Sequence, residues 1–165
     1  MFLSVEALAQ DALKPRVSPL AITSIRYKDA YLKIVYSQPQ KKGREIFGKL
    51  VPFGEVWRTG ANEATEITIT QDISVNDKLI LKAGTYSLFT IPNKEKWTVI
   101  FNKDLGLWGA YNYDYKKDVL RFDVDAKTIE QVCEPFIINI DQKTDTAEII
   151  LKWDKTQINF PIKFI

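Results

Sequence analysis

The segment from Gly43 to Thr65 is the one irregular, strongly polar stretch in a chain that otherwise alternates apolar and polar residues. Arginine offers a planar fork that binds carboxylate, phosphate or carbonyl oxygens, and asparagine supplies both a donor and an acceptor. These residue types predict a binding site for a small polar, oxygen-rich ligand such as a saccharide or a carboxylate. The candidate ligand-binding residues are Arg44, Glu45, Trp57, Arg58, Asn62 and Glu63.

A structural role for the same side chains is the alternative. A long irregular segment needs polar side chains to satisfy its own backbone groups. In this interpretation Arg58 bonds loop carbonyls, Glu63 pairs with an arginine of the segment, and Asn62 occupies a left-handed turn. Residue types alone leave both interpretations open.

A carboxylate-dependent hydrolase is a third possibility. Because the chain has no histidine, acid–base chemistry near neutral pH would fall to a glutamate whose pKa is raised. Glu45 and Glu63 would then face each other across a cleft, as paired carboxylates do in glycosidases. No catalytic residue can be assigned from this pattern, and the sequence leans against an enzyme.

The residues that the chain lacks exclude several classes of protein. Zero histidines and a single cysteine among 165 residues predict no metal site, no internal disulfide and no cofactor. The 23 basic and 21 acidic residues give a formal charge of +2, which is too balanced to favour nucleic acid. No apolar run is long enough for a transmembrane segment. The oligomeric state is left open.

Period-two alternation dominates the chain and predicts an all-β fold. Turn signals recur about every 8–12 residues, which is typical of an antiparallel β-sandwich, jelly-roll-like or barrel-like. Only residues 44–51 show a helical spacing, and they predict one short helix. We expect one domain over residues 18–165, after a leader and linker at residues 1–17. The expected strands lie at residues 21–27, 30–37, 66–70, 73–75, 78–81, 85–91, 97–102, 119–124, 136–141, 147–153 and 157–164.

A second candidate feature is the aromatic run from Trp108 to Tyr115. Tyr111, Tyr113 and Tyr115 are spaced two residues apart, so the run predicts a strand at residues 107–113 with the rings on one face. Such a face can stack on sugar rings, but it more often completes a core. We therefore expect these rings to be packed.

Several blocks of the sequence resemble a known bacterial family, domain-of-unknown-function family 2911. They are GREIFGKLVPFGEVWRTGANEAT, AGTYSLFTIP, WTVIFN, WGAYNYDYKKDVLRF and WDKTQINFPI. The resemblance implies a single β-rich domain that is usually made with a secretion signal. The family has no established activity, so it assigns no catalytic residue. Its motif residues here are Gly43, Arg44, Trp57, Arg58, Gly60, Asn62 and Glu63.

The first ten residues fit the secretion signal that the resemblance implies. Ala7, Leu8 and Ala9 form the small-x-small pattern that signal peptidase recognises, although Glu6 interrupts the preceding apolar stretch. Residues 1–10 are therefore interpreted as the remnant of a signal peptide, and the expected location is periplasmic or extracellular.

Overall fold

The computed structural model describes residues 15–165. The predicted signal-peptide remnant at residues 1–10 lies outside this range. Within the described part of the chain, no helix has the length and apolar character needed to cross a bilayer.

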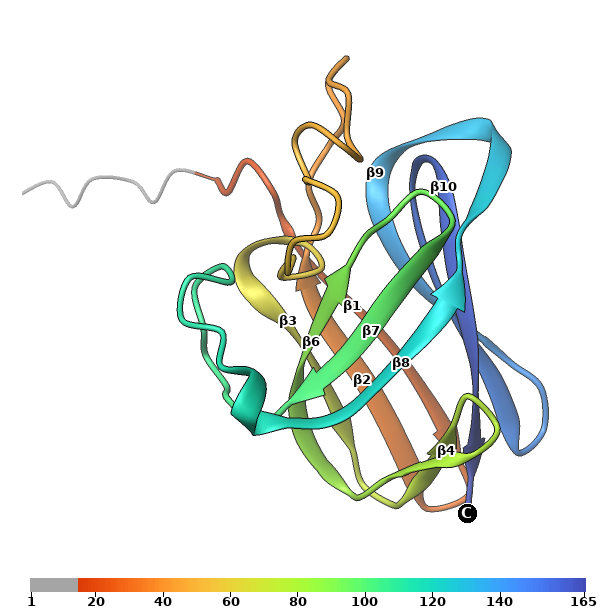
Figure 1. Cartoon of the computed structure of the whole chain (residues 1–165). Coiled ribbons are helices and arrows are strands. Elements are labelled where there is room, and N and C mark those ends of the chain that lie inside the picture. The colour runs from red at the N-terminus through yellow and green to blue at the C-terminus, as the bar shows by residue number, and fades with distance from the viewer. Residues whose placement is uncertain (1–14) are drawn as a thin grey trace, which may run out of the picture.

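Two antiparallel sheets form the domain (Figure 1). The larger has six strands in the order β1-β2-β3-β6-β7-β8, and the smaller has four in the order β5-β4-β10-β9. The sheets do not close into a barrel, so the predicted all-β antiparallel sandwich is confirmed and its barrel-like form is not. The strands are β1 (Leu20–Tyr27), β2 (Ala30–Ser37), β3 (Ala61–Ile69), β4 (Ile73–Val75), β5 (Leu79–Leu81), β6 (Gly84–Ile91), β7 (Lys96–Asn102), β8 (Asp118–Asp125), β9 (Lys127–Gln142) and β10 (Thr146–Phe164).

Strand β10 doubles back on itself near Asp154, as its dark blue ribbon shows in Figure 1. The Phe164 backbone N–H donates to the Asp145 carbonyl at 2.9 Å, and Asn159 Nδ2 donates to Glu148 at 2.8 Å. Asp154 has a left-handed φ of 52°, which lets the chain reverse there. The turn therefore coincides with the break predicted between residues 147–153 and 157–164.

The core lies between the sheets and is filled by alternate residues of the strands. In β2, Leu32 and Ile34 are fully buried while their neighbours are only partly covered. The same period places Trp153 and Phe160 of β10 in the core, because successive strand side chains point to opposite faces. Burial of these apolar side chains is the main favourable term in folding.

The crossover segment (residues 38–60) connects β2 to β3 and caps one end of the sandwich, orange to yellow in Figure 1. The short helix predicted at residues 44–51 is wrong, because this stretch folds as consecutive turns. Gly48 has a φ of 93°, and its N–H donates forward to the Val51 carbonyl, so no helical hydrogen-bond ladder forms. Ile46 is nonetheless fully buried. The helix-like spacing of apolar residues at positions 44–51 therefore arises because most of them are buried or half-buried beneath compact turns.

The aromatic loop (residues 103–117) replaces the strand predicted at residues 107–113. Gly106 and Gly109 have left-handed φ values of 66° and 68°, which break the alternation. Packing was predicted wrongly for Tyr111 and Tyr115, which are 83% and 67% exposed, and Trp108 of the same run is 58% exposed. The loop ends in a single 3-10 turn, η1 (Tyr115–Lys117), which is the helical element of residues 15–165.

Tyr113 is the ring of the loop that packs inward. It makes an edge contact with Phe89 at a centroid distance of 5.0 Å, over a small apolar cluster on the outer face of the larger sheet. Leu107 and Ala110 cover the same cluster. This anchorage holds the aromatic loop against the sheet while three of its rings stay in solvent.

Candidate functional site

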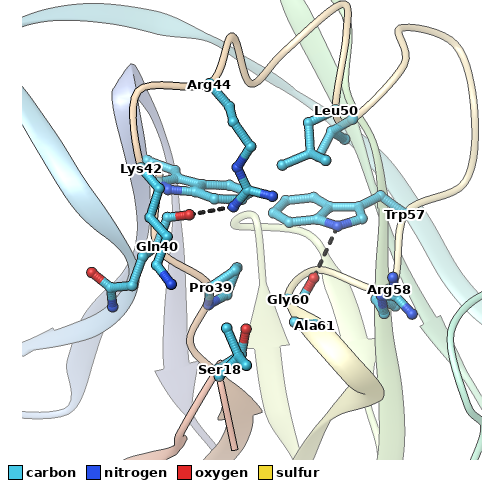
Figure 2. A pocket seen from close by; sticks show the side chains of 13 residues that line it. Ser18, Pro39, Gln40, Lys42, Arg44, Leu50, Trp57, Arg58, Gly60 and Ala61 are labelled. Carbon is cyan, nitrogen blue, oxygen red and sulfur yellow. Dashed lines mark hydrogen bonds between the residues drawn. The ribbon is translucent and has the colours of Figure 1, made fainter.

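A pocket of about 480 Å³ opens between the crossover segment and the end of the sandwich (Figure 2). We call it the crossover pocket. Residues far apart in the sequence form it, from the chain before β1 to the turn of β10. Its lining residues are Val17, Ser18, Pro39, Gln40, Lys42, Arg44, Leu50, Val51, Trp57, Arg58, Gly60, Ala61 and Trp153.

Positive charge lines this pocket. Lys42, Arg44 and Arg58 all contribute to its wall, and no aspartate or glutamate of the described residues does. None of the three cations forms a salt bridge within residues 15–165. Three basic groups attract an anion. The Glu134 carboxylate lies close by, outside the lining, where it accepts from the Lys42 backbone N–H at 2.6 Å.

Arg44 is oriented by the backbone of its own segment. Its Nε donates to the Lys41 carbonyl at 3.0 Å, and one terminal nitrogen donates to the Gln40 carbonyl. Figure 2 shows the side chain descending from the crossover segment between Lys42 and Trp57. The remaining guanidinium donors are available to a ligand, since arginine carries five.

Tryptophan rings form the apolar wall. Trp57 and Trp153 stack with centroids 5.9 Å apart and an interplanar angle of 15°. Trp57 Nε1 donates to the Gly60 carbonyl at 3.1 Å, which fixes the ring (Figure 2). Both rings are more than nine-tenths buried, so they form a rigid surface beside the cations.

The turn after Arg58 is held by hydroxyl groups. Thr59 is fully buried with a φ of 56°, a strained conformation for a β-branched residue. Its Oγ1 lies 3.0 Å from Thr90 Oγ1, and its carbonyl accepts from Thr65 Oγ1 at 2.6 Å. A Cβ on Gly60 would lie 2.9 Å from the Ser37 carbonyl oxygen, so only glycine allows this close approach. These contacts set the position of Arg58.

Asn62 has the left-handed conformation that the structural alternative predicted, but it lies near the start of β3 and not in a turn. It is in a left-handed conformation with a φ of 58°. Its carbonyl accepts from Arg58 Nη1 at 3.2 Å and from the Gly109 N–H at 2.9 Å. Asn62 does not line the crossover pocket, but it joins a pocket residue to the aromatic loop.

Glu63 pairs with Arg16, and not with the arginines of the crossover segment. The two guanidinium–carboxylate hydrogen bonds are 2.7 and 2.8 Å long. The hydrogen bond from Arg16 is the main reason why the pKa of Glu63 is lowered. The pair ties down the chain just before Val17 and Ser18, which line the pocket.

A family model described as "Protein of unknown function (DUF2911)" matches residues 18–162. The chain belongs to this family. Comparison with curated proteins and with solved structures found no match to this DUF2911 chain. The comparisons therefore confirm the resemblance and name no reaction.

The two glutamates proposed as a hydrolytic pair lie in different places in this DUF2911 domain. Glu45 is exposed and lines a smaller pocket of about 200 Å³ with Asp154 and Lys155. Glu63 lines a third depression of about 180 Å³ on the outer side of the larger sheet. Neither borders the crossover pocket, so the structure does not place these carboxylates across one cleft.

Three of the five charged and aromatic residues that line the pocket were predicted from the sequence. Arg44, Trp57 and Arg58 line it, whereas Glu45, Asn62 and Glu63 do not. Lys42 was missed although it directly precedes the polar stretch that begins at Gly43 of the DUF2911 chain. Trp153 was missed because no local pattern connects residues that lie about a hundred positions apart. Arg16, the partner of Glu63, gave no signal for the same reason.

Proposed function

We propose that this domain binds a small organic anion, such as a sugar acid, in the crossover pocket. One observation carries the proposal: three cationic side chains, two tryptophan rings and no carboxylate of residues 15–165 line the same pocket. Charge-assisted hydrogen bonds to a carboxylate are roughly twice as strong as neutral ones. The pocket volume of about 480 Å³ also lies within the usual range for small-molecule sites.

The lining also supports a carboxylate over a neutral saccharide. A neutral sugar needs acceptors as well as donors, and carboxylates usually supply them in proteins. Here the charged groups are all donors. A ligand with an anionic group and a flat or apolar face would use both the cations and the tryptophan wall.

The other proposals are weaker. Separate locations for Glu45 and Glu63 leave the hydrolase without an observation in its favour. A periplasmic or extracellular location remains part of our proposal, and it is supported by the Ala7-Leu8-Ala9 pattern and by the family resemblance.

Calorimetric titration with matched acid and neutral ligands tests the proposed function. We expect galacturonate to bind at least about tenfold more tightly than galactose, and benzoate more tightly than benzamide, because only the acids carry the charge that the pocket selects. Raising the ionic strength should weaken binding of the acids.

A pair of lysine variants provides the matched control. Lys42→Gln should weaken acid binding by about tenfold, whereas Lys49→Gln should leave it unchanged. Lys49 is an exposed lysine of the same crossover segment, and it lies outside the crossover pocket. Equal affinity for acids and their neutral partners, or no binding of either acid, would refute the proposed function.

A further inference from the structure

Tyr111 stands next to the rim of the crossover pocket. A Cβ placed on Gly109 would lie 2.8 Å from Tyr111 Cε2 and 3.0 Å from Arg58 Nη1. The phenol ring and the guanidinium group therefore approach the same point and are neighbours. Arg58 also lines the pocket, so one side chain is shared between the pocket wall and the surroundings of the aromatic loop.

The aromatic loop is held in this place by hydrogen bonds at several positions. The Gly109 N–H donates to the Asn62 carbonyl at 2.9 Å, and the Ala64 N–H donates to the Leu107 carbonyl at 2.8 Å. At the far end of the loop, Lys117 Nζ lies 2.6 Å from Asp104 Oδ1. A loop ordered in this way presents its exposed rings without a large entropy loss on binding.

The exposure of Tyr111 indicates what kind of group it could contact. Its side chain is 83% exposed, and Trp108, which directly precedes Gly109, is 58% exposed. Exposed aromatic groups gathered on one loop commonly mark an interaction site. A sugar ring suits such a platform, because its C–H face packs on an aromatic ring while its hydroxyl groups stay hydrated. A wholly apolar group would instead favour an enclosed site.

We propose that the ligand is an acidic oligosaccharide, with one uronate carboxylate in the crossover pocket and an adjoining sugar ring on Tyr111. This inference rests on the proposed function, because it places the anionic residue among the same three cations. It adds a second subsite, whose defining residue is Tyr111 and whose link to the first is Arg58. The cations favour a sugar unit that carries a carboxylate, and the Tyr111 ring favours an oligosaccharide of at least two sugar units.

Titration with galacturonate and with its di- and trisaccharides tests this inference. We expect the oligosaccharides to bind about tenfold more tightly than the monosaccharide, because one additional ring contact is formed. Tyr111→Ala should remove this gain and leave binding of the monosaccharide unchanged. Tyr115→Ala is the matched control, since Tyr115 is 67% exposed on the same loop. That variant should keep the gain.

The possible results separate the two proposals. If galacturonate binds but longer chains gain nothing, or if Tyr111→Ala keeps the gain, the second subsite is refuted and the anion pocket stands. Binding of benzoate without binding of any uronate would also refute the second subsite and leave the anion pocket standing. If neither benzoate nor a uronate of any length binds, both proposals fail.

Discussion

Trp57→Ala is expected to lower the free energy of unfolding by about 3–5 kcal/mol, the range for removing a large buried aromatic side chain. Trp57 is 8% exposed and contacts four other aromatic rings. Its centroid lies 5.0 Å from that of Phe136 and 5.9 Å from that of Trp153. The substitution would leave a cavity where the crossover segment meets the end of both sheets.

Equilibrium unfolding in urea would measure this effect as a lower midpoint with an unchanged slope. Trp57→Phe should lower the free energy of unfolding less, because it keeps an aromatic ring in the cluster. What it loses is the part of the ring system that phenylalanine lacks and the hydrogen bond from Nε1 to the Gly60 carbonyl. Trp108→Ala is the control on an exposed tryptophan, and its effect should stay within about 0.5 kcal/mol. A loss below about 1 kcal/mol for Trp57→Ala would show that the ring cluster does not support the crossover segment.

Asp118→Ala is expected to lower the free energy of unfolding by about 2–3 kcal/mol, because it leaves buried donors without their acceptor. The Asp118 carboxylate accepts from Asn102 Nδ2 at 2.8 Å and from the Tyr113 hydroxyl at 2.7 Å. Asn102 is fully buried. Arg121 adds a salt bridge at 2.8 Å from the exposed side. This carboxylate joins β7, β8 and the aromatic loop.

The ionisation of Tyr113 offers a second readout of the same substitution. Burial, together with the hydrogen bond to Asp118, raises the pKa of Tyr113 to about 12. Without the carboxylate, Arg121 would remain 2.7 Å from the phenol oxygen, so the pKa of Tyr113 should fall. Absorbance titration of the tyrosines can follow this change. Asp123→Ala, which removes an exposed carboxylate of β8, is the control. It should leave the pKa of Tyr113 unchanged and lower the free energy of unfolding by less than about 1 kcal/mol. No pKa change in Asp118→Ala would contradict the account.

Strand positions could be predicted because burial on one face repeats every second residue. The β2 pattern shows this directly, since Leu32, Ile34 and Tyr36 are all buried. The same reasoning failed at residues 44–51, where Ile46 and Val51 are buried by turns that happen to copy a helical spacing. The spacing of apolar residues indicates which side chains are buried, but more than one backbone conformation can bury the same side chains.

The aromatic loop shows the opposite error. Tyr111, Tyr113 and Tyr115 have the spacing of a strand, yet only Tyr113 packs against the sheet. The glycine at position 109 could have warned against a strand, because a left-handed residue ends the alternation. In the site, Arg44 and Arg58 were found through their charge, whereas Trp153 required knowledge of the tertiary fold.

Arg58→Ala distinguishes a binding site from a structural network most directly, if stability and galacturonate affinity are measured on the same variant. Within residues 15–165 the Arg58 side chain makes one hydrogen bond, to the Asn62 carbonyl, and that carbonyl keeps its bond from Gly109 when the side chain is removed. We therefore predict that the free energy of unfolding falls by no more than about 1.5 kcal/mol, while galacturonate binds at least about tenfold more weakly. A loss of several kcal/mol with unchanged affinity of the folded protein would contradict the binding account and favour a structural role.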